Sequence, residues 1–296
     1  MKFHSPLRYP GGKSKLTPLI KELISDSGLE NATYVEPFAG GAGVAMSLLM
    51  DGAVSQIVIN DLDKAIYSFW RAIKNDSKTL ISMIANTPIT IEERKRQLLI
   101  YHSEKRYSVE LAFATLFLNR VNRSGIITGG PIGGHEQSGK WKLDARFNKD
   151  AIVERIADIA QRKSAIVIYN QDVISLIDKF VPKYSGNAFV YFDPPYYKKA
   201  ERLYKNALSH DDHVRIAKRI LGLADCNWLL TYDNVPEIRE LYSLQGIKCF
   251  DLNYSAANKG RASEIMVCSD AQLLNRAVGR DKSWAMLNLR NYEEMS

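Results

Sequence analysis

The stretch FVYFDPPYYKK, residues 189–199, joins an apolar run to an acid, two prolines and two tyrosines. The run Phe189–Phe192 has the composition of a strand buried on both faces. Proline fixes its own φ and has no N–H to donate, so two successive prolines end a strand. In the simplest interpretation the motif is only a turn, with Asp193 capping the next segment. The sequence thus predicts a core strand that ends at a carboxylate followed by aromatic rings.

Strands and helices alternate on both sides of this run. We predict helical segments at 16–24, 44–50, 66–73, 174–180, 214–223 and 238–244. We predict strands within 33–38, 56–61, 165–172, 189–196, 227–233, 246–254 and 264–269. This alternation predicts an α/β fold with a mainly parallel sheet that is covered by helices on both faces, and ligands bind such sheets at the carboxyl ends of the strands.

A basic segment interrupts the alternation between residues 75 and 149. Helical patterns come first, and a glycine-rich stretch, 119–140, follows that is long enough to be unusual in a compact domain. Residues 94–149 hold eleven basic and four acidic side chains, so this segment alone accounts for the net charge of +7. Concentrated positive charge favours a polyanionic partner, most simply nucleic acid. We therefore predict a nucleic-acid-binding insertion with helical and hairpin-like parts.

Composition excludes several other classes of protein. With 296 residues, 46% of them hydrophobic, the chain is long enough to bury a full core. It has no apolar run near the roughly 20 residues of a membrane span, and its start lacks the apolar middle of a signal peptide. The three cysteines fit reduced core thiols, and the five histidines form no metal-binding pattern with cysteine. We expect a cytoplasmic protein with no metal site.

A glycine-rich turn, residues 39–43, follows the strand predicted at 33–38. Glycines at such a turn let the backbone approach a nucleotide, although a tight turn with no ligand is about equally probable from this feature alone. Asp61 lies about 20 residues beyond Gly40, at the end of the next strand, where an acid can accept hydrogen bonds from ribose hydroxyls. Together, the turn and the acid predict an adenosine-bearing cofactor.

The residues Asp193-Pro194-Pro195-Tyr196 suit the recognition of a flat base with an exocyclic amine. The carboxylate and the Pro194 carbonyl can accept the two N–H bonds of such an amine, which frees its lone pair for an electrophile. Tyr196 offers a face on which the base can stack. A base enters such a pocket only after leaving the duplex, at a cost of a few kcal/mol.

These motifs resemble those of the S-adenosylmethionine-dependent adenine-specific DNA methyltransferases, and their order resembles the Dam-like, D12 class. The resemblance is carried by Phe38-x-Gly40-x-x-Gly43 and by residues 193–196, together with the stretches 8–13, 117–120 and 146–148. It covers the chain from Leu7 to about Val267. It implies a Rossmann-like methyltransferase fold, S-adenosylmethionine as cofactor and double-stranded DNA as partner, with no membrane partner.

The resemblance also implies a role for individual residues. The catalytic residues would be Asp193, Pro194 and Tyr196. The cofactor would be bound by Tyr9, Lys13, Glu36, Phe38, Gly40, Asp61, Asp172 and Asp193. The DNA-binding candidates are Asn119, Arg120, Asn122, Arg123, Ser124, Lys140, Lys142, Lys259 and Arg261. The alternative for each basic residue alone is a solvated surface charge.

The family pattern divides the chain into three parts. Residues 1–74 and 150–270 would form the catalytic domain, 75–149 the target-recognition insertion, and 271–296 a C-terminal tail. The stretch 123–128 departs from GATC-reading relatives, because arginine and serine replace an aromatic residue and an asparagine. This departure argues against GATC recognition. The sequence leaves open the actual recognition site and whether the enzyme has a partner restriction endonuclease. Two alternatives are an RNA adenine methyltransferase and a catalytically silent DNA-binding regulator.

Overall fold

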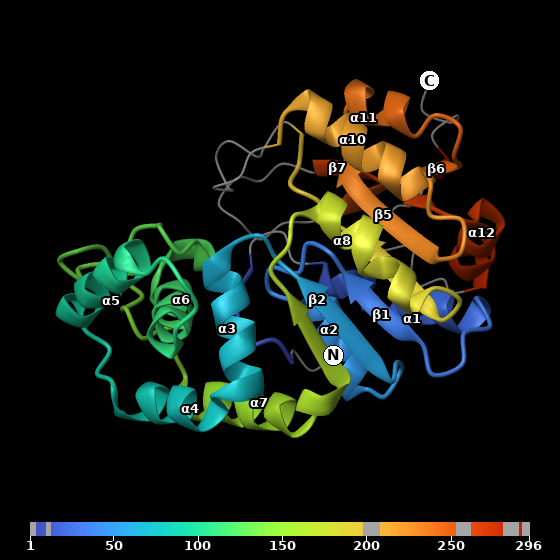
Figure 1. Cartoon of the computed structure of the whole chain (residues 1–296). Helices are drawn as coiled ribbons and strands as arrows, with labels where there is room; N and C mark the ends of the chain where they lie inside the picture. The colour runs from blue at the N-terminus through green and yellow to red at the C-terminus, as the bar shows by residue number, and fades with distance from the viewer. Residues whose placement is uncertain (1–3, 10–12, 198–207, 253–261, 281–289, 292–296) are drawn as a thin grey trace. The chain divides into compact units, whose positions relative to one another are not determined.

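The computed structural model describes residues 4–9, 13–197, 208–252, 262–280 and 290–291 (Figure 1). The chain splits into two compact units. The first unit comprises Met1–Ser14, Ala39–Asp51 and Ile59–Asn170, and the second comprises Lys15–Phe38, Gly52–Val58 and Gln171–Ser296. This is a division by packing, so the predicted functional division into a catalytic domain and a target-recognition insertion stays a prediction.

The strands form one mixed sheet with the order β3-β2-β1-β4-β5-β7-β6-β8. β1 pairs in parallel with β4, and β4 with β5, whereas β7 is antiparallel to both β5 and β6, and β6 is antiparallel to β8. The strands are β1 (Thr33–Glu36), β2 (Gln56–Asn60), β3 (Ile166–Tyr169), β4 (Ala188–Phe192), β5 (Asn227–Asp233), β6 (Ile247–Leu252), β7 (Ala262–Cys268) and β8 (Arg290–Asn291). The predicted α/β class is confirmed.

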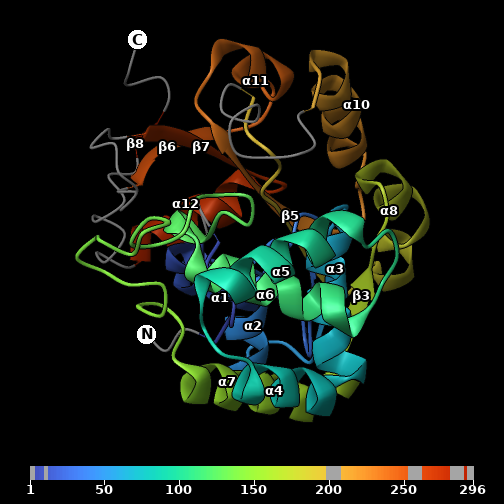
Figure 2. The same cartoon turned by 90° about the vertical axis from the view of Figure 1, so that its left-hand side faces the viewer.

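In the second unit, helices cover both faces of the sheet (Figures 1 and 2). α8 and α11 both contact α10, and these three helices lie on one face; α1 and α12 contact each other on the opposite face. Their bounds are α1 (Thr17–Asp26), α8 (Val173–Lys179), α10 (His210–Leu221), α11 (Pro236–Leu241) and α12 (Ala271–Arg280), with a 3-10 helix η4 (Val181–Tyr184).

α12 belongs to the stretch that the sequence predicts as a C-terminal tail. Its side chains Leu273, Leu274 and Ala277 are buried, and Arg280 pairs with Asp26 of α1 at 2.6 Å. Residues 271–280 are therefore part of the packed second unit.

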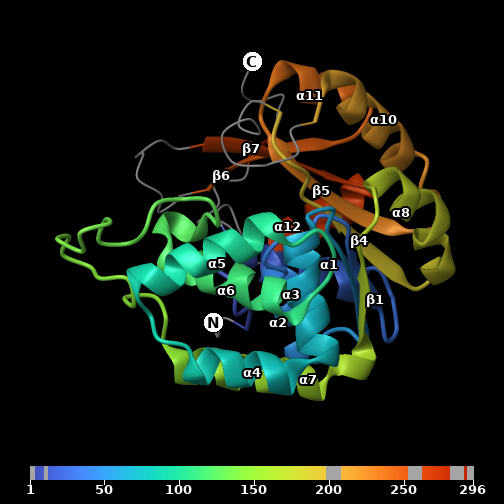
Figure 3. The same cartoon turned by 60° about the vertical axis from the view of Figure 1, so that its left-hand side comes forward.

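The helices of the first unit gather around α6 (Figure 3). Every residue of α6 from Leu111 to Val121 is buried, which explains why the run 111–118 is almost entirely apolar. α6 contacts α3, α4 and α5, and α4 runs beside α7. The bounds are α2 (Gly43–Met50), α3 (Lys64–Asn75), α4 (Ser77–Asn86), α5 (Ile91–Ser103), α6 (Val109–Val121) and α7 (Lys149–Gln161), with 3-10 helices η1 (Ser14–Leu16), η2 (Arg123–Gly125) and η3 (Lys163–Ala165).

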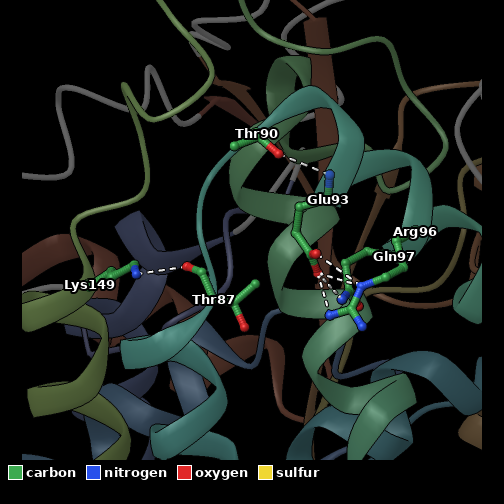
Figure 4. Close-up of polar contacts among 6 residues, drawn as sticks. All are labelled: Thr87, Thr90, Glu93, Arg96, Gln97 and Lys149. Atoms are coloured by element: carbon green, nitrogen blue, oxygen red, sulfur yellow. Dashed lines mark hydrogen bonds and ion pairs between the residues drawn. The ribbon is translucent and has the colours of Figure 1, made fainter.

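Side-chain caps fix where these helices begin and end (Figure 4). Thr90 caps α5 by accepting the backbone N–H of Glu93 at 3.1 Å. The Glu93 carboxylate then accepts from Arg96 at 2.9 Å and from Gln97. At the end of α4, Lys149 donates to the Thr87 carbonyl at 2.7 Å, which ties the start of α7 to the α4–α5 connection.

No helix among the described residues has the length and hydropathy to cross a membrane. The described part of the chain also holds no group of three or more side chains placed to bind a metal ion.

Candidate active site and DNA-binding loop

Strand register places two polar side chains of β5 beside the motif that follows β4. β4 is buried along its whole length, and its last residue, Phe192, pairs with Leu230 of β5. Asp193 therefore comes out of the sheet next to Thr231, which donates to its Oδ1 at 2.9 Å. Two residues further along β5, Asp233 pairs with Glu264 of β7.

The residues after Asp193 are anchored to the same two strands. The Tyr196 ring is buried, and its hydroxyl donates to the Glu264 carboxylate. The backbone N–H of Tyr197 donates to the Asp233 Oδ1 at 3.0 Å. With Thr231, three polar side chains from β5 and β7 thus hold one short loop. A loop fixed at three points presents its carboxylate and ring in one orientation.

Two histidines of α10 pack against Tyr197. The Tyr197 hydroxyl shares a hydrogen bond with His210 Nδ1 at 3.1 Å, and its ring lies 5.0 Å from the His213 ring. His213 is buried and hydrogen-bonds the Tyr232 hydroxyl. Burial lowers the pKa of His213, against the opposite effects of Asp233 and Asp212, and this favours the neutral ring. The sequence showed only that the histidines form no metal-binding pattern with cysteine, and these contacts with Tyr197 were missed.

In the first unit, the predicted glycine turn is closed by hydrogen bonds to its backbone. Gly40 has a φ of +46°, in the left-handed region. Its N–H donates to Asp61 Oδ2 at 2.8 Å, and its carbonyl accepts from the Trp70 indole at 2.9 Å. The N–H of Ala39 donates to the Asn60 carbonyl at 2.8 Å. These bonds place the turn directly against the end of β2.

Asp61 accepts backbone N–H bonds on both oxygens, from Gly40 and from Asp63 at 2.9 Å. Burial raises the pKa of Asp61 to about 7, although both N–H bonds act in the opposite direction. The carboxyl group therefore changes charge near neutral pH. Each carboxylate oxygen has a second lone-pair direction, so these bonds are compatible with a further donor.

Tyr9 explains why glycine is needed in this turn. A Cβ on Gly40 would lie 2.7 Å from the Tyr9 ring, and a Cβ on Gly41 would lie 2.7 Å from the Tyr9 Cβ. Lys13, also in the first unit, is 5% exposed, unlike the solvated lysine that usually begins a helix. The structure thus brings together Tyr9, Gly40 and Asp61 of the predicted cofactor set.

The other predicted cofactor residues lie in the second unit. Glu36 is buried at the end of β1, and Phe38 is partly buried two residues later. Asp172 is exposed and caps α8 by accepting the N–H of Ile174 at 2.9 Å. This capping bond explains the acid at position 172 without a ligand, so its contact with the cofactor stays a prediction.

Three of the predicted DNA-binding residues are buried within the first unit. Asn119 accepts the N–H of Arg8 and donates to the carbonyls of Arg8 and Gly125, each at 2.7 Å. Asn122 accepts from the Arg94 guanidinium at 2.7 Å and donates to the Ile127 carbonyl at 2.7 Å. These side chains hold the loop after α6 in shape, so a direct contact with DNA would require the loop to open.

The third residue, Arg120, is held by backbone carbonyls. It donates to the carbonyl of Pro6 and, at 3.3 Å, to that of Arg146. Burial lowers its pKa to about 10, with Arg155 and Arg8 acting in the same direction. The basic segment is thus only partly a surface feature, because Arg94 and Arg120 are both buried.

The exposed part of the loop carries the remaining described candidates. Arg123, Ser124, Lys140 and Lys142 are exposed. Between the two lysines, Trp141 is 63% exposed, and the Lys140 Nζ lies 5.7 Å from its ring centre. The sequence did not single out this tryptophan. The predicted Lys259 and Arg261 lie outside the described residues.

A sequence model of the family described as "D12 class N6 adenine-specific DNA methyltransferase" matches residues 9–255. The match spans both units and most of the chain. The chain belongs to this family.

Two relatives of the D12 enzyme are named as type II methyltransferases. The type II methyltransferase M1.LlaDCHI of Lactococcus lactis subsp. cremoris is 25% identical over 282 residues, covering 88% of this chain and 93% of the relative. The type II methyltransferase M.MjaIII of Methanocaldococcus jannaschii is 24% identical over 231 residues, covering 72% of this chain and 77% of the relative. The predicted family and enzyme class are therefore confirmed.

Two solved structures are weakly similar to the D12 enzyme. The rRNA methyltransferase aviRa from Streptomyces viridochromogenes has a TM-score of 0.37 at 13% identity, covering 90% of this chain and 89% of its own. A putative RNA methyltransferase from Pyrococcus horikoshii has a TM-score of 0.37 at 12% identity, covering 88% and 85%. Likenesses this weak carry no information about the substrate.

Membership of the D12 family implies S-adenosylmethionine-dependent methylation of adenine in DNA. The first unit fits such a cofactor, because a glycine turn with left-handed backbone at Gly40 and Ala42 leads into α2, which has no side-chain cap. The Asp61 carboxylate at the end of β2 is the acceptor that a ribose needs. We conclude that these residues fit an adenosine-bearing group.

Proposed function

We propose that this D12 enzyme flips an adenine out of duplex DNA and methylates its 6-amino group by direct in-line transfer. The observation that carries the proposal is the loop after β4, in which Asp193 and Tyr196 are each held by a side chain of a neighbouring strand. A fixed carboxylate beside a fixed aromatic ring suits an exocyclic amine on a flat base. The coarser activity, adenine methylation of DNA, already follows from the family.

Three residues would handle the base. Asp193 would accept one N–H of the amine, and the Pro194 carbonyl would accept the other. Both bonds direct the nitrogen lone pair away from the ring. Tyr196 would stack on the base, and its bond to Glu264 supports this role because it holds the far end of the ring in place. Holding the amine in one orientation supplies much of the rate in a transfer that needs no covalent enzyme intermediate.

The cofactor roles follow the family pattern residue by residue. S-adenosylmethionine, when bound, supplies a sulfonium methyl group. Lys13 would pair with the cofactor carboxylate, beside Tyr9. Asp61 would accept bonds from the ribose hydroxyls. Contacts are proposed also for Glu36, Phe38, Gly40, Asp172 and Asp193.

The exposed charges after α6 would contact the DNA backbone. Arg123, Lys140 and Lys142 are exposed in the described loop, and phosphate contacts by such side chains give affinity without sequence preference. Lys259 and Arg261 belong to the same proposal on sequence grounds alone. Because both relatives are named type II methyltransferases, a partner restriction endonuclease is proposed too. A cytoplasmic location completes the proposal, and the three cysteines, all free and buried, are consistent with it.

The test uses the purified full chain, unmethylated plasmid DNA and S-adenosylmethionine with an isotopically labelled methyl group. We expect mass spectrometry of the digested DNA to find the label in N6-methyldeoxyadenosine, and Asp193→Ala to abolish it. Labelled methyl in structured RNA but not in DNA would refute the proposed substrate. Full activity of Asp193→Ala would refute the proposed site.

A further inference from the structure

A chain of two hydrogen bonds runs from the core of the second unit to Asp193. Tyr191 of β4 lies 2.8 Å from the Thr231 Oγ1, and the Thr231 hydroxyl lies 2.9 Å from the Asp193 Oδ1. Tyr191 and Thr231 are both completely buried. Both hydroxyl groups are therefore shielded from bulk water.

The donors and acceptors of these two hydrogen bonds follow from the number of protons that each group has to donate. An ionised carboxylate only accepts, so Thr231 must donate its single proton to Asp193. The Tyr191 hydroxyl must then donate to the Thr231 oxygen. Burial, and next the charge of Asp193, raise the pKa of Tyr191 well above its usual value, so the phenol keeps the proton that it donates. Both hydroxyl groups are thus polarised toward the carboxylate.

The backbone also fixes the geometry of these two hydrogen bonds. Threonine is β-branched, and its χ1 is restricted, so a threonine held in a paired strand presents its hydroxyl in one direction. Thr231 is paired with Met266 of β7 on one side, and its neighbour Leu230 is paired with Phe192 of β4 on the other. The hydroxyl is therefore held at the point where β4 ends.

We propose that Thr231 and Tyr191 are positioning residues that orient the Asp193 carboxylate for the target amine. The inference rests on the proposed function, since it assigns the same carboxylate. Thr231 supplies a charge-assisted hydrogen bond that restrains the rotation of the carboxylate. Tyr191 holds the Thr231 hydroxyl in its donating orientation. Neither residue touches the substrate in this account.

The decisive variants are Thr231→Val, which removes the donor and keeps the shape, Thr231→Ser, which keeps the hydroxyl, and Tyr191→Phe. Displacement of a catalytic group by about 1 Å costs up to 100-fold in rate, so we expect Thr231→Val to lower kcat about 10- to 100-fold. The KM for DNA and for S-adenosylmethionine should change less than about twofold. Thr231→Ser should recover most of the loss, and Tyr191→Phe should lower kcat about three- to tenfold.

Thr115→Val is the matched control. Thr115 is also fully buried, but its hydroxyl donates to the Leu111 carbonyl at 2.7 Å in α6. We expect this variant to keep the wild-type kcat, which separates the loss of a buried hydroxyl from the loss of orientation. If Thr231→Val does not fold, Tyr191→Phe decides the outcome, because its substitution leaves both strands intact.

Asp193→Ala, measured in parallel, separates the two claims. Suppose that Asp193→Ala is inactive but Thr231→Val keeps the wild-type kcat; this result would overturn the inference and leave the proposed function standing. If Thr231→Val does not fold, a wild-type kcat in Tyr191→Phe has the same meaning. An active Asp193→Ala would overturn the proposed function itself. A loss of rate in Thr231→Val that Thr231→Ser does not recover would also contradict the positioning role.

Discussion

Replacing Asn119 with alanine tests whether this residue supports the loop after α6 or contacts DNA itself. The side chain is buried and makes three hydrogen bonds of 2.7 Å, two with the backbone of Arg8 and one with the Gly125 carbonyl. A hydrogen bond contributes about 1 kcal/mol net, and a buried group left without its partner costs more. Asn119→Ala should therefore lower the free energy of unfolding by roughly 3 to 4 kcal/mol.

That loss is large enough to appear in a thermal melt. The entropy of unfolding is about 2.1 cal/mol/K per residue, so in a chain of 296 residues 1 kcal/mol shifts Tm by about 1.6 °C, and we expect a decrease of roughly 5 to 6 °C. The matched control is Arg123→Ala, because the Arg123 side chain is exposed and the bonds described for this residue are made by its backbone. Its N–H donates to the Gly130 carbonyl at 2.9 Å, and its carbonyl accepts the N–H of Ile126 at 3.2 Å, so the substitution keeps both. This control should keep its Tm.

The two variants should also differ in how they bind a DNA duplex. If DNA affinity is measured against salt concentration, Arg123→Ala should weaken binding and flatten the salt dependence, since one phosphate contact is lost. Asn119→Ala should weaken binding only together with its loss of stability. An Asn119→Ala protein with wild-type Tm and reduced DNA affinity would refute the supporting role and show a direct contact.

Three further predictions concern single residues. Gly125→Ala should destabilise the chain by more than about 1 kcal/mol, because the new Cβ would meet the Arg8 carbonyl at 2.2 Å at a φ of +76°; a wild-type melt would contradict this geometry. Glu264→Gln should lower kcat more than the affinity for DNA, since the anchor of the Tyr196 hydroxyl is weakened, and stopped-flow binding beside turnover assays separates the two. Burial raises the pKa of Asp61 to about 7, so this carboxyl group holds its proton more tightly in the folded state than in the unfolded state. The free energy of unfolding should therefore fall as pH rises from about 4 to 7. In urea titrations, Asp61→Asn should show a smaller fall than the wild type.

Much of the fold follows from local pattern. The run at 188–192 is apolar and bounded by turn residues, and β4 occupies it. Likewise α6 (Val109–Val121) contains the apolar run 111–118, and a run that is apolar on every side of a helix must be buried. Such elements are predictable, since the signal lies within one segment.

Contacts between segments were not predictable in the same way. Thr231, Asp233 and Glu264 anchor the loop after β4 only because β5 lies between β4 and β7 in a particular register. The sequence of a strand does not determine which strand pairs with it, so nothing in the sequence distinguishes these three residues from ordinary strand positions. The resemblance proposes Asn119 and Arg120 as DNA contacts, and it did not indicate that both side chains are buried and bonded to backbone carbonyls of distant segments. Their contact with DNA stays a prediction.

The most direct test of the central claim is single-molecule sequencing of genomic DNA from a methylation-deficient bacterium that expresses this chain. We predict N6-methyladenine in the wild-type sample, at one short motif or over many contexts, and none in a strain expressing Asp193→Ala at the same level. Absence of methyladenine from the wild-type sample, or equal methylation in both strains, would contradict the account.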